Sequence, residues 1–402
     1  MITLRTRMAG LMLAFGFFFF SSCTLFNHTV EDSETRLQSG NPESALSEVN
    51  RVLEEDGHNE DALLLKAEIL AELARMEDSP DRRENYYREM RETLSTPGFE
   101  PSGRFRSRRD QLSRSAWNRE QEAGLRLLQQ ENARNYRQIV SHFENAIVIN
   151  PDSSTTYSLK ATTHYSNGDL RLAIETLETG RNRILDFPAD YSEKLAFLYL
   201  EEGQLEQSAS LYRYLLDRDP DNTSIRDGLI NAHILAGNHH ESVPLLRELA
   251  GESPENIHYQ ESLVTELVFR ASGLADSLSG VPSLSEADAD ELIRQLEEAE
   301  QMIRSLIDRQ PSREEFTYAA AALYKNSAQI LLSLSDSEHV QETLADSLRE
   351  RSNHLLHTAL PLWETVAERN PENREIWNSL YQIYTQLGMS EEAEATRSRI
   401  NL

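Results

Sequence analysis

The sequence predicts an all-α fold in which helical hairpins stack one on the next to form a solenoid. Three features point to it: prolines that recur beside acidic or polar residues, glycines midway between those prolines, and apolar residues that recur at fixed offsets. A short hairpin cannot bury its apolar face by itself. Each hairpin therefore has to pack against its neighbours along the chain.

The prolines mark the ends of the predicted hairpins. Each of them follows an amphipathic stretch, and the set is Pro151, Pro220, Pro254, Pro311 and Pro371. Proline ends the helix before it, and we expect the Asp, Glu or Asn that follows to cap the next helix. Glycines lie where the first helix of each pair would end, and they are Gly168, Gly203, Gly237 and Gly388. Glycine readily takes the positive φ that such a helix end needs.

The clearest pair of hairpins repeats after 34 residues. The first set of marks is Leu195, Tyr199, Gly203, Tyr212, Leu215 and Pro220, and the second is Leu229, His233, Gly237, Leu246, Leu249 and Pro254. This pattern resembles the tetratricopeptide repeat, and the last unit fits it best with Trp377, Leu380, Tyr384, Gly388, Ala393 and Ile400. The resemblance implies a right-handed superhelix of about six to eight hairpins with insertions.

The N-terminus has the pattern of a secretion signal. Arg5 and Arg7 precede an apolar run that is too short for a comfortable membrane span. The residues Phe20-Ser21-Ser22-Cys23 then resemble the bacterial lipobox, which implies cleavage before Cys23 and attachment of acyl chains such as palmitate to it. Thr24 stands where an Asp often implies inner-membrane retention. We therefore expect a lipid-anchored protein of the cell envelope, at the outer membrane and facing the periplasm.

The predicted organisation of the chain has four parts. Residues 1–22 form the lipoprotein signal peptide, 23–34 a lipidated tether, 35–135 degenerate N-terminal helical hairpins, and 136–402 the repeat solenoid. Insertions rich in Gly, Ser and acids are expected near 271–290 and 333–341. In a solenoid such insertions fall on loops.

Composition excludes several functions. The net charge of −27 opposes binding to nucleic acid, which is itself a polyanion. A single cysteine excludes an internal disulfide framework and any site with several Cys ligands. We find no readable catalytic motif, and therefore predict no enzyme, no catalytic residue and no cofactor. His239-His240-Glu241 is expected in a solvated turn, and we predict no metal site there or at His354 and His357.

One basic segment departs from the acidic average. Its arginines are Arg104, Arg106, Arg108, Arg109, Arg114 and Arg119. Two interpretations remain open at this point. The segment docks an acidic partner or lipid headgroups, or it pairs with the surplus of acids in the same molecule.

The resemblance also predicts a partner-binding groove lined by the first helices. The candidate lining residues are Thr162, Tyr165, Phe197, Asn231, Ile234, Thr265, Phe269, Tyr318, Asn378 and Gln382. By the same offsets, the acids Glu193 and Asp227 would also line the groove. Repeat proteins of this kind that clamp a free carboxylate use Lys, Arg and Asn at the offsets that Thr162, Phe197, Asn231 and Thr265 occupy here. These four offer one Asn and no cation, so we predict no carboxylate clamp.

Signal, anchor and repeats together predict an interaction scaffold. It would hold another envelope protein, as a peptide or helix in the groove, near the membrane to which Cys23 is attached. The alternative is a ligand-binding or accessory subunit of an envelope solute transport system, which would need a closed cavity.

Overall fold

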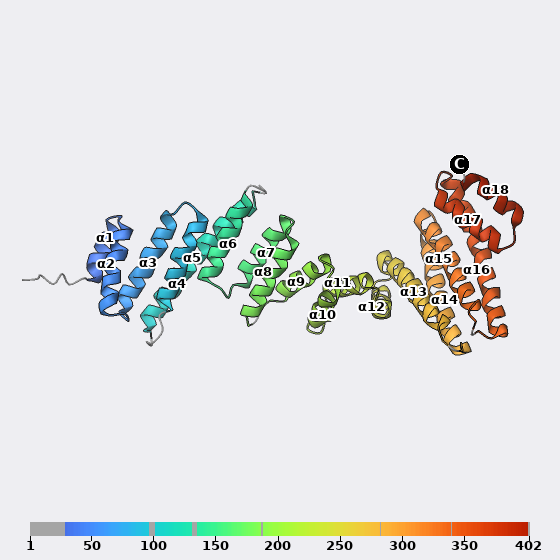
Figure 1. The fold of residues 1–402 in the computed structure, drawn as a ribbon, viewed down its shortest axis with the longest axis horizontal. Helices are drawn as coiled ribbons and strands as arrows, with labels where there is room; N and C mark the ends of the chain where they lie inside the picture. The colour runs from blue at the N-terminus through green and yellow to red at the C-terminus, as the bar shows by residue number, and fades with distance from the viewer. Residues whose placement is uncertain are drawn as a thin grey trace, which may run out of the picture. The chain divides into compact units, whose positions relative to one another are not determined.

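The computed structural model describes residues 29–95, 101–130, 135–185, 188–281, 283–338 and 340–400. Every regular element in these ranges is an α-helix, which confirms the predicted all-α fold (Figure 1). The chain divides into two compact units, Met1–Asn167 (unit 1) and Gly168–Leu402 (unit 2). Over the described ranges, no helix combines the length and the apolar character needed to cross a membrane.

Unit 1 begins with helices that have weak repeat marks. Its helices are α1 (Val30–Gln38), α2 (Pro42–Glu55), α3 (Glu60–Met76), α4 (Pro80–Leu94), α5 (Gly103–Leu128), α6 (Tyr136–Ile149) and α7 (Ser154–Ser166). The described residues of both units hold eighteen helices, more than the predicted six to eight hairpins need. The segment 35–135, predicted to form degenerate N-terminal helical hairpins, is helical over most of its described residues.

The tether predicted for residues 23–34 does not extend to residue 34, because residues 30–34 belong to helix α1. Helix α1 starts at Val30, because the Thr29 side chain accepts a hydrogen bond of 3.1 Å from the Asp32 backbone N–H. The negative charges of Glu31 and Asp32 in the first turn also stabilise the helix, because they lie at the positive end of its dipole. The signal peptide and Cys23 lie outside the described residues.

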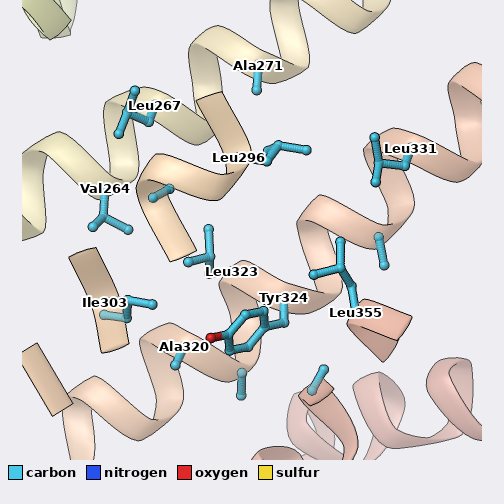
Figure 2. Close-up of a cluster of buried hydrophobic side chains, with 14 of the residues drawn as sticks. Val264, Leu267, Ala271, Leu296, Ile303, Ala320, Leu323, Tyr324, Leu331 and Leu355 are labelled. Carbon is cyan, nitrogen blue, oxygen red and sulfur yellow. The ribbon is translucent and has the colours of Figure 1, made fainter. Parts of the chain in front are cut away.

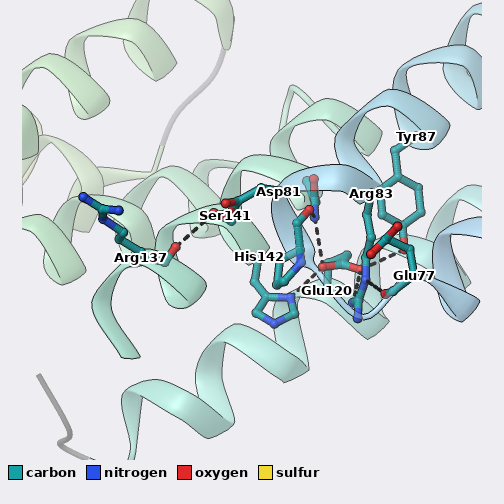
Figure 3. Close-up of polar contacts among 10 residues, drawn as sticks. Glu77, Asp81, Arg83, Tyr87, Glu120, Arg137, Ser141 and His142 are labelled. Carbon is teal, nitrogen blue, oxygen red and sulfur yellow. Dashed lines mark hydrogen bonds and ion pairs between the residues drawn. The ribbon is translucent and has the colours of Figure 1, made fainter. Parts of the chain in front are cut away.

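A buried polar cluster joins α4, α5 and α6 in unit 1. Glu120 of α5 is completely buried, and its Oε1 accepts hydrogen bonds from Tyr87 (2.8 Å) and Arg83 (3.1 Å) of α4 (Figure 3). Its Oε2 lies 2.7 Å from His142 Nδ1 and 3.3 Å from Asn145 Nδ2, both on α6. One carboxylate thus ties three helices together. Such a buried charge is tolerated only when its lone pairs are satisfied.

The electrostatics of this cluster favour ionised Glu120. Burial alone raises the pKa of the carboxyl, but the hydrogen bonds from His142 and Tyr87 and the positive charge of Arg83 lower it, and the net direction is down. Burial and the charge of Glu120 together raise the pKa of the Tyr87 hydroxyl, so that Tyr87 remains a donor.

Unit 2 contains the regular hairpins. Its helices are α8 (Leu170–Arg183), α9 (Ala189–Glu201), α10 (Leu205–Leu216), α11 (Thr223–Leu235), α12 (His239–Glu252), α13 (Ile257–Ser279), α14 (Glu286–Arg309), α15 (Glu314–Ser335), α16 (Glu342–Arg369), α17 (Arg374–Gln386) and α18 (Ser390–Ile400).

The glycine turns inside the hairpins are as predicted. Positive φ angles occur at Gly168, Gly203, Gly237 and Gly388, and also at Gly40 of unit 1. At Gly203 the turn is closed by a 2.8 Å bond from the Gln204 N–H to the Tyr199 carbonyl, and at Gly388 by a 2.9 Å bond from the Met389 N–H to the Tyr384 carbonyl. This is the hydrogen bond of a helix that ends on a left-handed residue.

The proline turns between hairpins are fixed by side chains from the next helix. The residue six positions after the proline donates to the proline carbonyl. The donors are Arg226 to Pro220 (2.8 Å), Gln260 to Pro254 (2.8 Å) and Trp377 to Pro371 (2.7 Å). Three different side chains therefore satisfy the same backbone oxygen in three turns.

The helix caps after these prolines lie one residue later than expected. The side chains of Asn222, Asn256 and Asn373 accept the capping N–H bonds, and each is the second residue after its proline. The acidic residue directly after each proline is instead part of the turn. An N-cap has extended backbone and is followed at once by helix, so a turn residue must separate it from the proline.

The insertion predicted near 271–290 is mostly helical. Helix α13 continues to Ser279 and α14 begins at Glu286, because Ala271, Ala275 and Leu278 keep a buried face on the extended helix. Near 333–341 the break lies between α15 and α16, after Ser335. The long helices α13 to α16 share one buried cluster, which includes Leu267, Leu296 and Leu323 (Figure 2).

Small residues let helices of unit 2 approach closely. The Ser208 hydroxyl of α10 donates to the Ala196 carbonyl of α9, and Ser352 of α16 donates to the Ala328 carbonyl of α15, both at 2.8 Å. Ala173 and Ala359 are completely buried. Gly228 of α11 lies against the ring of Tyr212 from α10, where a β-carbon would overlap the ring.

Gly228→Ala should destabilise unit 2, because the added methyl collides with the Tyr212 ring. We expect the free energy of unfolding to fall by about 1–3 kcal/mol, as for other overpacked sites. Urea denaturation followed by circular dichroism measures it. Gly251→Ala is the matched control, since nothing lies near its β-carbon, and it should change stability by less than about 0.5 kcal/mol. Equal effects of the two substitutions would contradict the packing argument.

Glu120→Gln should destabilise unit 1 by about 3 kcal/mol, because Arg83 loses its buried counter-charge and the new amide opposes donors from α6. Hydrogen exchange of the backbone amides in α4, α5 and α6 locates the loss. Glu122→Gln on the exposed face of α5 is the control and should leave exchange unchanged. Wild-type protection in the Glu120 variant would refute the structural role of this carboxylate.

Acid should weaken unit 1 through the same residue. The pKa of Glu120 is below its ordinary value of 4.5 in the folded protein, so its stabilisation is present above the unfolded pKa. That stabilisation is lost as the pH falls through the lower folded pKa. Unfolding free energy of the wild type should therefore decline more steeply below about pH 4.5 than that of Glu120→Gln. Parallel curves would exclude this linkage.

Candidate functional site

The predicted groove residues lie on the first helices of the hairpins. Thr162 and Tyr165 are on α7 of unit 1. The others, in unit 2, are Phe197 on α9, Asn231 and Ile234 on α11, Thr265 and Phe269 on α13, Tyr318 on α15, and Asn378 and Gln382 on α17. Thr162 and Ile234 are half-buried, and the remaining eight are exposed. Exposure leaves them available to a ligand, while their role in binding stays a prediction.

Three successive first helices of unit 2 carry matching stripes of side chains. Residues four apart lie on one face of a helix. The stripes are Glu193, Phe197 and Glu201 on α9, Asp227, Asn231 and Leu235 on α11, and Glu261, Thr265 and Phe269 on α13. We call these nine residues the grid. The residues at one level of the grid are 34 positions apart in the sequence.

The first level of the grid is an acidic ladder of Glu193, Asp227 and Glu261. The Ser224 hydroxyl of α11 donates to Glu193 Oε1 at 2.7 Å, and the Tyr259 hydroxyl of α13 donates to Asp227 Oδ2 at 3.3 Å. The carboxylates of Glu193 and Asp227 are thus each held against the next helix. These bonds show that the three stripes adjoin one another at this level.

The acidic ladder has little neutralising charge around it. Within the part of the chain that the structure describes, none of its carboxylates forms an ion pair with Arg or Lys; Glu261 lies 3.4 Å from the exposed His258. Lys194 follows Glu193, but it is half-buried and burial lowers the pKa of its amine. Burial also raises the pKa of Asp227, against the lowering effects of the Tyr259 hydrogen bond and of the positive charge of the neighbouring Arg226. A further cation beside Asp227 would relieve the remaining cost.

The grid also exposes apolar side chains. The exposed fractions are 38% for Phe197, 63% for Leu235 and 53% for Phe269. Phe269 stacks on the His239 ring, with centroids 5.3 Å apart and planes inclined by 15°. Exposed aromatic and aliphatic side chains that are held in place are typical anchors for a partner protein.

His239 was expected in a solvated turn, and this expectation is wrong. It is the first residue of α12, and its Nδ1 lies 2.9 Å from Oε2 of the buried Glu266. Asn238 serves as the N-cap, which brings His239 into the helix and against α13. Over the described ranges, no group of three or more His, Cys, Asp or Glu side chains is placed to hold a metal ion.

Sequence reasoning missed Glu201, Leu235 and Glu261 as members of this surface. The signal was present, since Glu261 follows Asp227 by the same 34 residues that separate Asp227 from Glu193. Leu235 and Glu201 each lie four residues after a stripe member.

The arginines of the basic segment lie on α5 in unit 1. Several pair within the molecule: Arg104 with Asp61 (3.4 Å), Arg108 with Glu68 (2.9 Å) and Arg109 with Asp110 (2.8 Å). Arg106 donates to the Pro101 carbonyl, Arg114 is exposed and Arg119 is half-buried. The pairing favours the intramolecular interpretation for half of the segment.

A cation does occur farther along unit 2. Lys325 of α15 donates to the Ser379 hydroxyl of α17 at 3.1 Å, and its Nζ lies 5.9 Å from the centroid of the Trp363 ring. Tyr318 meets the same ring edge to face at 5.5 Å. Burial lowers the pKa of the Lys325 amine. Lys325 does not occupy any of the four positions on which the prediction of no carboxylate clamp was based.

Comparison with known proteins identifies the repeat. Residues 199–267 match the tetratricopeptide repeat family model, and this segment runs from the end of α9 into α13. It therefore includes most of the grid. A search of curated proteins finds no match to the sequence.

Solved structures with similar folds are distant in sequence. A tetratricopeptide repeat protein from Parabacteroides merdae has 10% identity, with 80% of this chain and 96% of that chain covered and a TM-score of 0.31. The C-terminal part of a repeat protein from Cytophaga hutchinsonii has 12% identity, with 71% and 93% covered and a TM-score of 0.40. The chain therefore contains a segment of tetratricopeptide repeats at residues 199–267, within the helical hairpins of unit 2.

Proposed function

We propose that this chain is a membrane-anchored interaction scaffold of the bacterial cell envelope. It binds another envelope protein through the first helices of its repeats and is held at the membrane by lipidated Cys23. The tetratricopeptide fold itself indicates a scaffold for protein–protein interaction, and proteins of this fold are generally not enzymes. The membrane anchor, the cell-envelope location and the envelope partner are further parts of this proposal.

The observation that carries the proposal is the exposed grid on α9, α11 and α13. It places anchors such as Leu235 and Phe269 next to carboxylates on a surface built by consecutive repeats. A surface of this kind offers side-chain contacts spread along a partner segment. The scaffold interpretation needs no chemistry beyond such contacts.

The lipobox-like residues support the anchor. Phe20-Ser21-Ser22-Cys23 follow an apolar run, and Cys23 is the single cysteine of the chain. Two or more acyl chains give stable anchoring, since each buried methylene contributes about 0.8 kcal/mol. Thr24 favours the outer membrane, with the repeats facing the periplasm. Nothing in the described residues favours the alternative of a transport accessory subunit.

Cys23→Ser should abolish the anchor, because serine has no thiol to acylate. In bacteria fed radiolabelled palmitate, we expect label on the wild-type chain in the membrane fraction and no label on the variant. Equal labelling of the variant would disprove lipidation at Cys23. The Asp219→Asn variant in a surface turn serves as the control and should be labelled like the wild type.

A photo-crosslinking amino acid at Asn231 or Thr265 should capture the partner in living cells. Both positions are exposed within the grid, and we expect a discrete crosslinked envelope protein that mass spectrometry identifies. The same amino acid at Glu206, which is exposed on the second helix α10, is the control. Capture of the same protein from Glu206 alone, or no capture from either grid position, would reject binding through the first helices.

A further inference from the structure

We propose that the grid docks a cationic segment of the partner, in which Lys or Arg side chains alternate with apolar ones. This inference rests on the proposed function and names the chemistry of the partner that the same surface takes. The acidic ladder would receive the cations, and the exposed apolar side chains of the grid would receive the apolar residues.

The ladder carboxylates differ from three acids on neighbouring second helices, which have arginine partners. On neighbouring second helices, Glu252 pairs with Arg226 (2.7 Å) and Glu298 with Arg247 (2.7 Å). Glu241 pairs with Arg213 at 3.2 Å. Arginine thus neutralises these three second-helix acids. The ladder acids keep their charge on a surface that the repeats leave exposed.

Hydroxyl donors orient the ladder without neutralising it. Ser224 and Tyr259 each occupy one oxygen, Oε1 of Glu193 and Oδ2 of Asp227, and no hydrogen bond in the described residues engages the second oxygen. The carboxylates are therefore held in place before a partner arrives. A Lys or Arg side chain forms a stronger, charge-assisted bond to such a pre-oriented carboxylate.

The exposed apolar side chains of the grid require that the partner segment also carry apolar residues. Leu235 lies eight residues after Asp227 on α11, and Phe269 lies eight residues after Glu261 on α13. At about 1.5 Å of rise per residue, these anchors are roughly 12 Å from the ladder along each helix. A purely cationic segment would leave them in water. A segment with both residue types covers both parts of the grid.

The test uses the full-length protein and labelled peptides measured by fluorescence anisotropy. The probe has repeats of Lys-Leu-Lys-Ser, and two reference peptides replace either its Lys by Glu or its Leu by Ser. We expect the wild type to bind the probe, to bind the Leu-to-Ser peptide more weakly, and not to bind the Glu peptide. Equal binding of probe and Glu peptide would overturn the proposal.

The matched variants each remove three negative charges. The ladder variant combines Glu193→Gln, Asp227→Asn and Glu261→Gln, which keep side-chain volume, and circular dichroism checks its fold. Its affinity for the probe should fall about tenfold, since each exposed ion pair contributes modestly. The control variant combines Glu206→Gln, Asp221→Asn and Glu255→Gln, all exposed and off the grid, and should change affinity by less than about twofold. Equal losses would show a general charge effect and refute the site.

Two further measurements separate this inference from the proposed function. If the crosslinker at Asn231 captures the same partner in the wild type and the ladder variant with equal yield, the scaffold function stands and the cationic docking fails. If it captures nothing in either protein, the scaffold function fails. The alternative occupant is a second copy of this chain, which would bind the grid through its arginine-rich helix α5. Sedimentation equilibrium detects such self-association. Self-association that the ladder variant abolishes would overturn the assignment to a separate partner.

Discussion

The repeat geometry of unit 2 depends on how the backbone carbonyl oxygen of a hairpin-closing proline is satisfied at Pro220, Pro254 and Pro371. That oxygen follows a helix end and has no partner within the helix, so it must find a donor elsewhere. The side chain six residues later supplies the donor, as Arg226 does for Pro220 and Trp377 for Pro371. Because the donor lies on the next helix, the bond fixes where that helix starts relative to the turn. A constant offset keeps equivalent residues of α11 and α13, such as Asp227 and Glu261 of the acidic ladder, at equivalent levels.

Much of this architecture was predictable because it depends on local backbone chemistry. Gly203 and Gly388 take the left-handed turn that the sequence position requires, and the helices end where prolines follow. The N-caps were placed one residue too early, since the expectation used the polar neighbour of proline rather than cap geometry. The extension of α13 to Ser279 was also missed. Gly, Ser and acidic residues in that stretch resemble a loop, but Ala271 and Ala275 retain enough buried face to continue the helix.

Long-range partners were beyond what the pattern predicts. Nothing near Glu120 in the sequence marks it as the centre of a buried cluster, because Arg83 and His142 come from helices 37 and 22 residues away. His239 was placed in solvent for the same reason, as Glu266 lies 27 residues later. The candidate surface was half predictable. Repeat offsets identify which side chains share a face, but only the structure shows that Glu241, Glu252 and Glu298 have arginine partners and that the ladder acids, in the described residues, do not.

The two kinds of carboxylate in this molecule show how environment decides role. Glu120 is sealed in unit 1 and receives donors at both oxygens from Tyr87, Arg83 and His142, so its bonding capacity is used within the fold. Glu193 and Asp227 receive one hydroxyl each and remain half-exposed. A buried charge must be satisfied for the protein to fold, whereas a half-exposed one is solvated well enough to wait for a partner. The ladder therefore costs unit 2 little stability while it keeps a directional, negatively charged surface available for binding.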